Sequence, residues 1–141
     1  MKTLLLLLGF WVLLGLVQCT KDEDPAVVKL GQKIELKKDQ SVQVVTAKAP
    51  VQLTVTEITD SRCPSGVNCV APGQADVSVE LRDGAGAVQK ATLCLGSCSN
   101  DSAAVVLDAV PYWLRLTDVN PYPSANARFG PQTATLYLTQ Q

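Results

Sequence analysis

The chain has 141 residues, a formal net charge of −1 and no histidine. Its lysines and arginines are scattered, so the sequence lacks the basic cluster by which proteins bind nucleic acid. Without histidine, Ser-His and Cys-His nucleophilic systems and most zinc sites are excluded, and we expect neither a metal nor a cofactor.

The first 18 residues have the pattern of an export signal. Lys2 supplies a positive charge, and an uncharged apolar run from Thr3 to Val17 follows it. This run is shorter than the ~20 apolar residues that a permanent membrane helix needs, so an uncleaved anchor is the less favoured alternative. We therefore expect residues 1–18 to be a cleaved signal peptide.

Leu16-Val17-Gln18-Cys19 follows the apolar run and resembles the lipobox, where bacteria attach lipid to a cysteine and cleave before it. Gln18 departs from the usual Gly, Ala or Ser. Residues 20–25, Thr-Lys-Asp-Glu-Asp-Pro, resemble the export signal of surface-exposed lipoproteins of the Bacteroidota. These resemblances imply that Cys19 carries the lipid, palmitate included, and that residues 19–26 tether the domain to the outer membrane. An ordinary secretory peptide that leaves Cys19 as a free thiol is the alternative.

From Val27 onward, short β-branched runs alternate with turn residues, and no 3.6-residue period is sustained. Asp83-Gly84-Ala85-Gly86 predicts a hairpin, because glycines supply the positive φ of tight turns. The predicted strands are Val27–Leu30, Lys33–Lys37, Ser41–Ala47, Val51–Thr59, Gln74–Arg82, Ala87–Leu95, Ala103–Asp108, Tyr112–Val119 and Thr133–Thr139. We expect one all-β domain over residues 27–141, a disulfide-stapled sandwich or open barrel of about 7–9 strands.

Four further cysteines, Cys63, Cys69, Cys94 and Cys98, can form two disulfides in an exported protein. The local pairing, Cys63–Cys69 with Cys94–Cys98, is favoured because each pair spans a short turn-rich segment; the crossed pairings remain the alternative. Strand alternation agrees with the local pairing, because it points Cys94 toward the surface, where Cys98 can meet it. Neither pair has the CxxC spacing of a redox catalyst or a zinc knuckle, so we expect a stabilising role.

Residues 60–69, Asp-Ser-Arg-Cys-Pro-Ser-Gly-Val-Asn-Cys, resemble the Asp-Ser-Arg-Cys-Pro-x4-Cys motif of a family of uncharacterised exported bacterial lipoproteins. An aromatic strand at 112–116 followed by Pro121-Tyr122-Pro123 extends the likeness over most of the domain. The tryptophan usual in that family after the second cysteine is Ala71 here, and the second cysteine pair looks like an addition. The resemblance implies a β-rich exported protein and brings no activity with it.

Arg62 and Asp60 are predicted to have a structural role, because a guanidinium can tie a carboxylate and carbonyls across an irregular turn. The functional alternative makes residues 65–68 an exposed, disulfide-stiffened loop presented to a partner. Tyr112 and Trp113 face opposite sides of their strand. One of them is therefore expected in the core, and the other is free to line a binding surface.

We expect a noncatalytic lipoprotein of the cell envelope, an accessory or binding module that contacts the membrane through its lipid anchor. An envelope protein or a glycan is the expected partner, and the Lys21–Asp24 signal favours exposure on the cell surface. Two alternatives remain. The first is a secreted protease inhibitor that presents the Cys63–Cys69 loop, and the second is a carboxylate-based enzyme using Asp60, Glu57 or Asp108.

Overall fold

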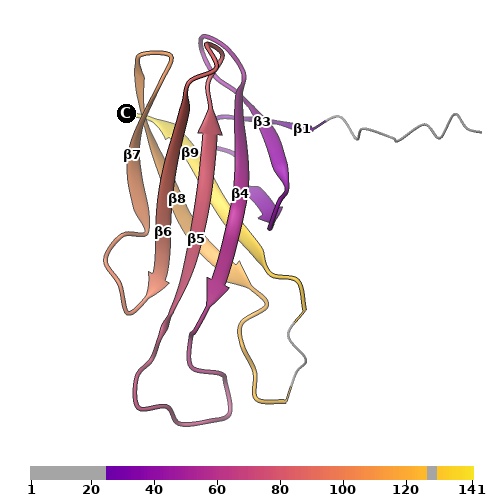
Figure 1. Ribbon diagram of the computed structural model, residues 1–141, viewed down its shortest axis with the longest axis vertical. Helices are drawn as coiled ribbons and strands as arrows, with labels where there is room; N and C mark the ends of the chain where they lie inside the picture. Colours follow the sequence, from indigo (N-terminus) through magenta and orange to yellow (C-terminus); the bar gives the residue numbers. More distant parts are fainter. Residues whose placement is uncertain (1–24, 127–129) are drawn as a thin grey trace, which may run out of the picture.

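The computed structural model describes residues 25–126 and 130–141, and within them nine strands form two packed sheets (Figure 1). The strands are β1 (Ala26–Lys29), β2 (Ile34–Lys37), β3 (Ser41–Val45), β4 (Val51–Asp60), β5 (Gln74–Arg82), β6 (Val88–Gly96), β7 (Ser102–Leu107), β8 (Val110–Asn120) and β9 (Thr133–Gln140). The predicted all-β class is confirmed, and the architecture is a sandwich. The predicted signal peptide and the tether residues 19–24, Cys19 included, lie outside the described residues.

One sheet has the order β1-β3-β4-β5-β6 and the other has the order β2-β9-β8-β7. β1 runs parallel to β3, and every other strand pair is antiparallel. Each predicted strand is present, and its ends lie within two residues of the predicted ones. The first strand begins at Ala26, one residue inside the predicted tether.

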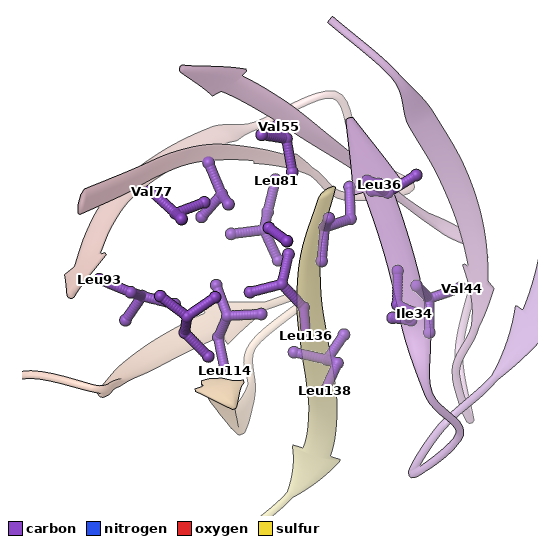
Figure 2. Close-up of a cluster of buried hydrophobic side chains, with 14 of the residues drawn as sticks. Ile34, Leu36, Val44, Val55, Val77, Leu81, Leu93, Leu114, Leu136 and Leu138 are labelled. Carbon is purple, nitrogen blue, oxygen red and sulfur yellow. The ribbon is translucent and has the colours of Figure 1, made fainter. Parts of the chain in front are cut away.

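The core lies between the two sheets and consists mainly of valine and leucine (Figure 2). Alternate residues of β5 and of the first part of β8 point inward, and each strand from β2 to β9 contributes at least one buried apolar side chain. Tyr112 belongs to this core, whereas Trp113, the next residue, lies on the outer face. Each fully buried Leu or Val side chain contributes about 1.5–3 kcal/mol relative to an exposed one.

Two β-bulges change the strand phase near the same end of the sandwich. Thr56 is the extra residue in β4, and Thr117 is the extra residue in β8. Before the bulge in β4 the odd-numbered residues point inward; after it, the even-numbered residues do. The side chain of Asp60 is therefore turned inward, although simple alternation from Val51 predicts an outward position. The bulge in β8 likewise turns Val119 into the core.

The predicted hairpin between β5 and β6 is present. The Asp83 amide donates to the Ala87 carbonyl at 3.0 Å, and the Gly86 amide donates to the Asp83 carbonyl at 3.0 Å. Gly86 has a φ of 87°, as expected, but Gly84 does not have a positive φ. Glycine is needed at position 84 for space instead, because a Cβ there would lie 2.4 Å from the Cβ of Ala49.

The β7–β8 turn offers a stabilising substitution. Leu107 pairs with Val110 across a two-residue turn in which Asp108 and Ala109 have φ values of 49° and 62°. Alanine in this left-handed region costs about 1–2 kcal/mol, whereas glycine adopts it freely. Ala109→Gly should therefore raise the free energy of unfolding by about 1 kcal/mol in urea denaturation. The same change at Ala104, within β7, should lower it, and equal losses at both positions would contradict this account.

The loops of the sandwich gather at its two ends (Figure 1). The β4–β5 loop, the β6–β7 loop and residues 121–126 lie at one end, and the hairpin turns lie at the other. The chain enters near the hairpin end, because Ala26 is level with Val42 and hence with Leu53. Leu53 is separated from Asp60 by about 20 Å of strand at ~3.3 Å per residue. In the described part of the chain, no helix could span a membrane.

Candidate functional site

Among the residues that the structure describes, the most densely bonded polar group is the pair formed by Arg62 and Asp60. The Arg62 Nε and backbone amide donate to Asp60 Oδ1 at 2.9 and 3.1 Å, and Arg62 Nη2 donates to Oδ2 at 2.6 Å. Gln132 Nε2 donates to the same Oδ2 at 2.6 Å. The Arg62 and Asp60 side chains are only 9% and 3% exposed. The carboxylate thus accepts hydrogen bonds from two separate segments of the chain.

Arg62 also joins the end of β4 to the end of β8. Its Nη2 donates to the Val119 carbonyl at 2.7 Å, and its Cζ lies 4.4 Å from the centre of the Tyr122 ring. Both contacts favour a guanidinium, which can make several directed bonds while its face stacks on an aromatic ring. We call Asp60, Arg62, Tyr122 and Gln132 the clamp. The predicted juxtaposition of Asp60 and Arg62 is present, and the sequence did not indicate the other two members.

The clamp lowers the pKa of Asp60. Burial alone raises the pKa of this carboxyl, but the hydrogen bonds and charge of Arg62, with the Gln132 amide, outweigh burial and hold the pKa below its usual value. The same hydrogen bond and charge raise the pKa of Arg62, against the effect of burial. Both groups therefore stay ionised at neutral pH, as a paired structural unit requires.

This lowered pKa predicts the acid sensitivity of the fold. A depressed pKa in the folded state adds stability that is complete above the unfolded value of about 3.9 and is lost as the pH falls through the folded-state pKa. Asp60→Asn should therefore be less stable at pH 7 and should lose less stability than the parent between pH 5 and 2. Urea denaturation across this range measures both curves, and parallel curves would contradict the assignment.

Backbone hydrogen bonds fix the loop that follows the clamp. The Ser61 amide donates to the Gln74 carbonyl, and the Cys63 amide donates to the Pro72 carbonyl, each at 2.8 Å. Further out, the Ser65 amide donates to the Pro123 carbonyl at 2.9 Å. These bonds extend the β4–β5 pairing beyond the strands and tie the loop to the β8–β9 connection. The loop is consequently held from both sides.

The outer part of this loop, residues 64–72, is here called the tip loop. It exposes Val67 and Val70, and Val70 is fully exposed to solvent. Figure 1 shows the connection between β4 and β5 as the part of the molecule farthest from the hairpin turns. An apolar side chain held in solvent by a rigid loop loses hydrophobic free energy unless a partner covers it. The tip loop can therefore act as a contact surface.

The two disulfides have the predicted local pairing. Cys63 bonds to Cys69 with a Cα–Cα distance of 5.9 Å, and Cys94 bonds to Cys98 with a Cα–Cα distance of 6.3 Å. Each closes a short loop and, by lowering the entropy of the unfolded chain, stabilises the fold by about 2 kcal/mol. Cys94 lies on the outer face of β6 as predicted, but it is buried there, because the following loop folds back and the Asn100 carbonyl accepts from the Cys94 amide at 3.0 Å.

The carboxylates considered for acid-base chemistry are not brought together. Glu57 lies on the surface 3.8 Å from the Lys38 ammonium, and Asp60 is engaged by Arg62. Asp108 lies in the β7–β8 turn, where its carboxylate accepts from the Gly84 amide at 3.3 Å. Within residues 25–126 and 130–141, no three Asp, Glu, Cys or His side chains form a metal-binding group.

The structure also shows a groove of which the sequence indicated only one member, Trp113. It lies on the outer face of β7, β8 and β9 and has a volume of about 810 Å³. Its lining residues are Asp101, Ser102, Trp113, Arg115, Thr117, Tyr137 and Thr139. Alternation along β8 indicates that Trp113 and Arg115 share a face, but the sequence does not give the register that places Tyr137 beside them.

Comparison with known proteins finds no matching family model, no matching curated protein and no matching solved structure. The tip loop is a rigid, partly apolar surface. The charged groups of the clamp beneath it are already bonded to each other. Such an arrangement suits binding by the loop rather than chemistry at Asp60 or Arg62.

Proposed function

We propose that this protein is a noncatalytic lipoprotein of the cell envelope, anchored through Cys19, that binds an envelope protein with its tip loop. The observation that carries the proposal is the rigid tip loop with exposed valines at the end of the sandwich remote from the chain entry. Loops on a rigid scaffold are the usual place for binding residues. The clamp supplies that scaffold.

The position of the tip loop suits a membrane-anchored module. Cys19 precedes Ala26 by seven residues, which reach at most about 25 Å at ~3.5 Å per residue. The described domain begins near the hairpin end, and the tip loop lies about 20 Å or more farther along the strands. A domain tethered in this way extends the tip loop away from the lipid surface, where a partner in the envelope can reach it.

The clamp also suits binding energetically. Ordering a loop during association costs free energy, and a loop that is already ordered avoids this cost. Arg62, the Cys63–Cys69 disulfide and the Ser65 backbone bond fix the tip loop before any partner arrives. Val67 and Val70 are then presented in one arrangement, and burying them against a partner would add about 25 cal/mol for each Å² of apolar surface removed from water.

The test is site-specific photo-crosslinking in intact cells that express the full chain. A crosslinking amino acid in place of Val70 should give one discrete adduct with an envelope protein. Val88 provides the matched control, because it is an exposed valine at the start of β6, near the opposite end of the sandwich. No adduct from position 70, or the same adducts from positions 70 and 88, would overturn the proposal.

A second candidate is a protease inhibitor, favoured by the closure of the exposed tip loop by Cys63–Cys69. A loop held on both sides can occupy a protease cleft without being released after cleavage. This candidate predicts that the adduct from position 70 contains a protease and that the full chain inhibits it. A nonproteolytic partner at position 70 would exclude the inhibitor and keep the binding module.

A further inference from the structure

The groove on the outer face of β7, β8 and β9 has features of a ligand site that is separate from the tip loop. Trp113 is 46% exposed within it, although it neighbours the buried Tyr112. Among the described residues, Tyr112 is the one aromatic side chain in the core, which is otherwise aliphatic. The Trp113 side chain is therefore not needed to fill the core, and its partly exposed indole is available to a ligand.

The strand register assembles the groove from three strands. Arg115 of β8 lies opposite Tyr137 of β9 and opposite Ser102 of β7, while Trp113 lies opposite Thr139. Directly opposite residues in antiparallel strands have Cβ atoms about 5 Å apart, and diagonal neighbours are about 7–8 Å apart. Trp113 and Tyr137 are such diagonal neighbours. Two aromatic side chains thus lie within the span of one or two sugar-sized rings.

The polar lining of the groove is internally neutral. Arg115 Nη2 lies 3.3 Å from Asp101 Oδ2, so the charged pair of the groove compensates itself. Ser102, Thr117 and Thr139 add hydroxyl groups. Those of Ser102 and Thr117 donate to the Asp101 carboxylate at 3.2 Å and the Thr135 carbonyl at 3.3 Å, and their oxygens can accept from a ligand. A phosphate or carboxylate ligand would meet one cation already paired with an acid. The lining is better matched to a neutral ligand that carries many hydroxyl groups.

The size of the groove favours a small ligand over a protein. Its volume of about 810 Å³ falls within the range of about 300–1,000 Å³ that is usual for small-molecule sites. A stable protein interface buries roughly 800 Å² and involves about 20–30 residues on each partner. Seven residues line this groove. The apolar face of a pyranose ring matches an aromatic ring, and its hydroxyls match the groove's charged pair.

We propose that this groove binds a neutral saccharide, with a sugar ring stacked on Trp113 and its hydroxyl groups bonded to Asp101 and Arg115. The proposal goes beyond the anchoring and the tip-loop contact proposed above. It assigns a second surface to the same domain, on a sheet face instead of a loop. A protein with both surfaces would link a glycan to an envelope protein.

The sequence provides a reporter for the test, because Trp113 is the only tryptophan beyond the predicted signal peptide. The full chain, purified from membranes in detergent, would be titrated with soluble neutral β-glucan, α-glucan, mannan and N-acetylglucosamine oligomers. Polygalacturonate serves as the acidic comparison. We expect at least one neutral glycan to change the fluorescence of Trp113 saturably and to release or absorb heat in calorimetry, and polygalacturonate to do neither.

Three variants locate the site. Trp113→Ala should weaken binding at least about tenfold, as truncation of a central aromatic contact usually does, while Trp113→Phe should keep it within about threefold because a ring remains. Val106→Ser, at an exposed position of β7 outside the groove, should leave binding unchanged. Circular dichroism verifies that each variant folds.

Several results would overturn the saccharide proposal. These are the absence of binding to every neutral glycan, binding of polygalacturonate alone, and equal effects of Trp113→Phe and Trp113→Ala in folded proteins. None of these results bears on the expected crosslinking at position 70 or on the expected lipid on Cys19. Failure of the groove and failure of the anchored binding module can therefore be distinguished.

Discussion

Arg62→Ala is expected to lower the free energy of unfolding by about 3 kcal/mol or more, because removing one partner of a buried ion pair leaves the other charge uncompensated. Asp60 would lose two of its four hydrogen bonds, those from Arg62 Nε and Nη2, and would keep those from the residue 62 backbone amide and from Gln132. The Val119 carbonyl would lose the bond from Arg62 Nη2. Urea denaturation of the parent and the variant measures the difference.

Two further variants make this prediction sharp. Arg62→Lys should restore only part of the loss, since an ammonium cannot reproduce the planar fork or the stacking on Tyr122. Arg115→Ala removes an exposed arginine whose ion pair is worth only about 0–1 kcal/mol, so it should change stability little. If Arg62→Ala unfolded at the same urea concentration as the parent but abolished the Val70 adduct, Arg62 would be a binding residue and the structural assignment would be wrong.

Gly73→Ala is expected to prevent folding or to destabilise the protein by more than about 3 kcal/mol, because two separate costs combine. Gly73 has a φ of 69°, which alanine adopts only with strain. A Cβ at this position would also lie 2.0 Å from the Ser61 carbonyl oxygen, and that carbonyl belongs to the backbone. The base of the tip loop would have to move apart, and the yield of soluble protein and its thermal melting both report this.

Gly66→Ala is the matched control. Gly66 also has a positive φ, 90°, but a Cβ there would meet no atom within 4 Å. This variant should suffer only the backbone strain, about 1–2 kcal/mol, and should remain folded. Equal effects of the two substitutions would show that close packing between Gly73 and Ser61 is not what determines the geometry of the loop.

The strands and both disulfides could be predicted from the sequence because each depends on local pattern. Alternation along β5, for example, places Ala75, Val77 and Val79 on one face whatever the rest of the chain does. The cysteines of each pair are four and six residues apart, so a short turn suffices to bring them together. Only the strand ends, which depend on pairing with neighbours, are displaced.

The clamp and the groove could be predicted only in part, because they depend on register and bulges. Asp60 and Arg62 lie close together because they are two residues apart, but the inward orientation of the Asp60 side chain depends on the extra residue Thr56. Gln132 reaches Asp60 across 72 residues of sequence, and nothing in the local pattern marks it. Similarly, Tyr137 meets Arg115 through the β8–β9 register, which the bulge at Thr117 shifts by one residue.

The mass of the amino-terminal peptide of the mature protein tests the proposed anchored module most directly. Protein isolated from its membrane and cleaved with a protease should yield a first residue, Cys19, that carries a thioether-linked diacylglycerol and an amide-linked acyl chain. At ~0.8 kcal/mol for each buried methylene, these chains together would hold the domain stably on a membrane. An unmodified peptide that begins at another residue, or a chain that retains residues 1–18, would contradict the account.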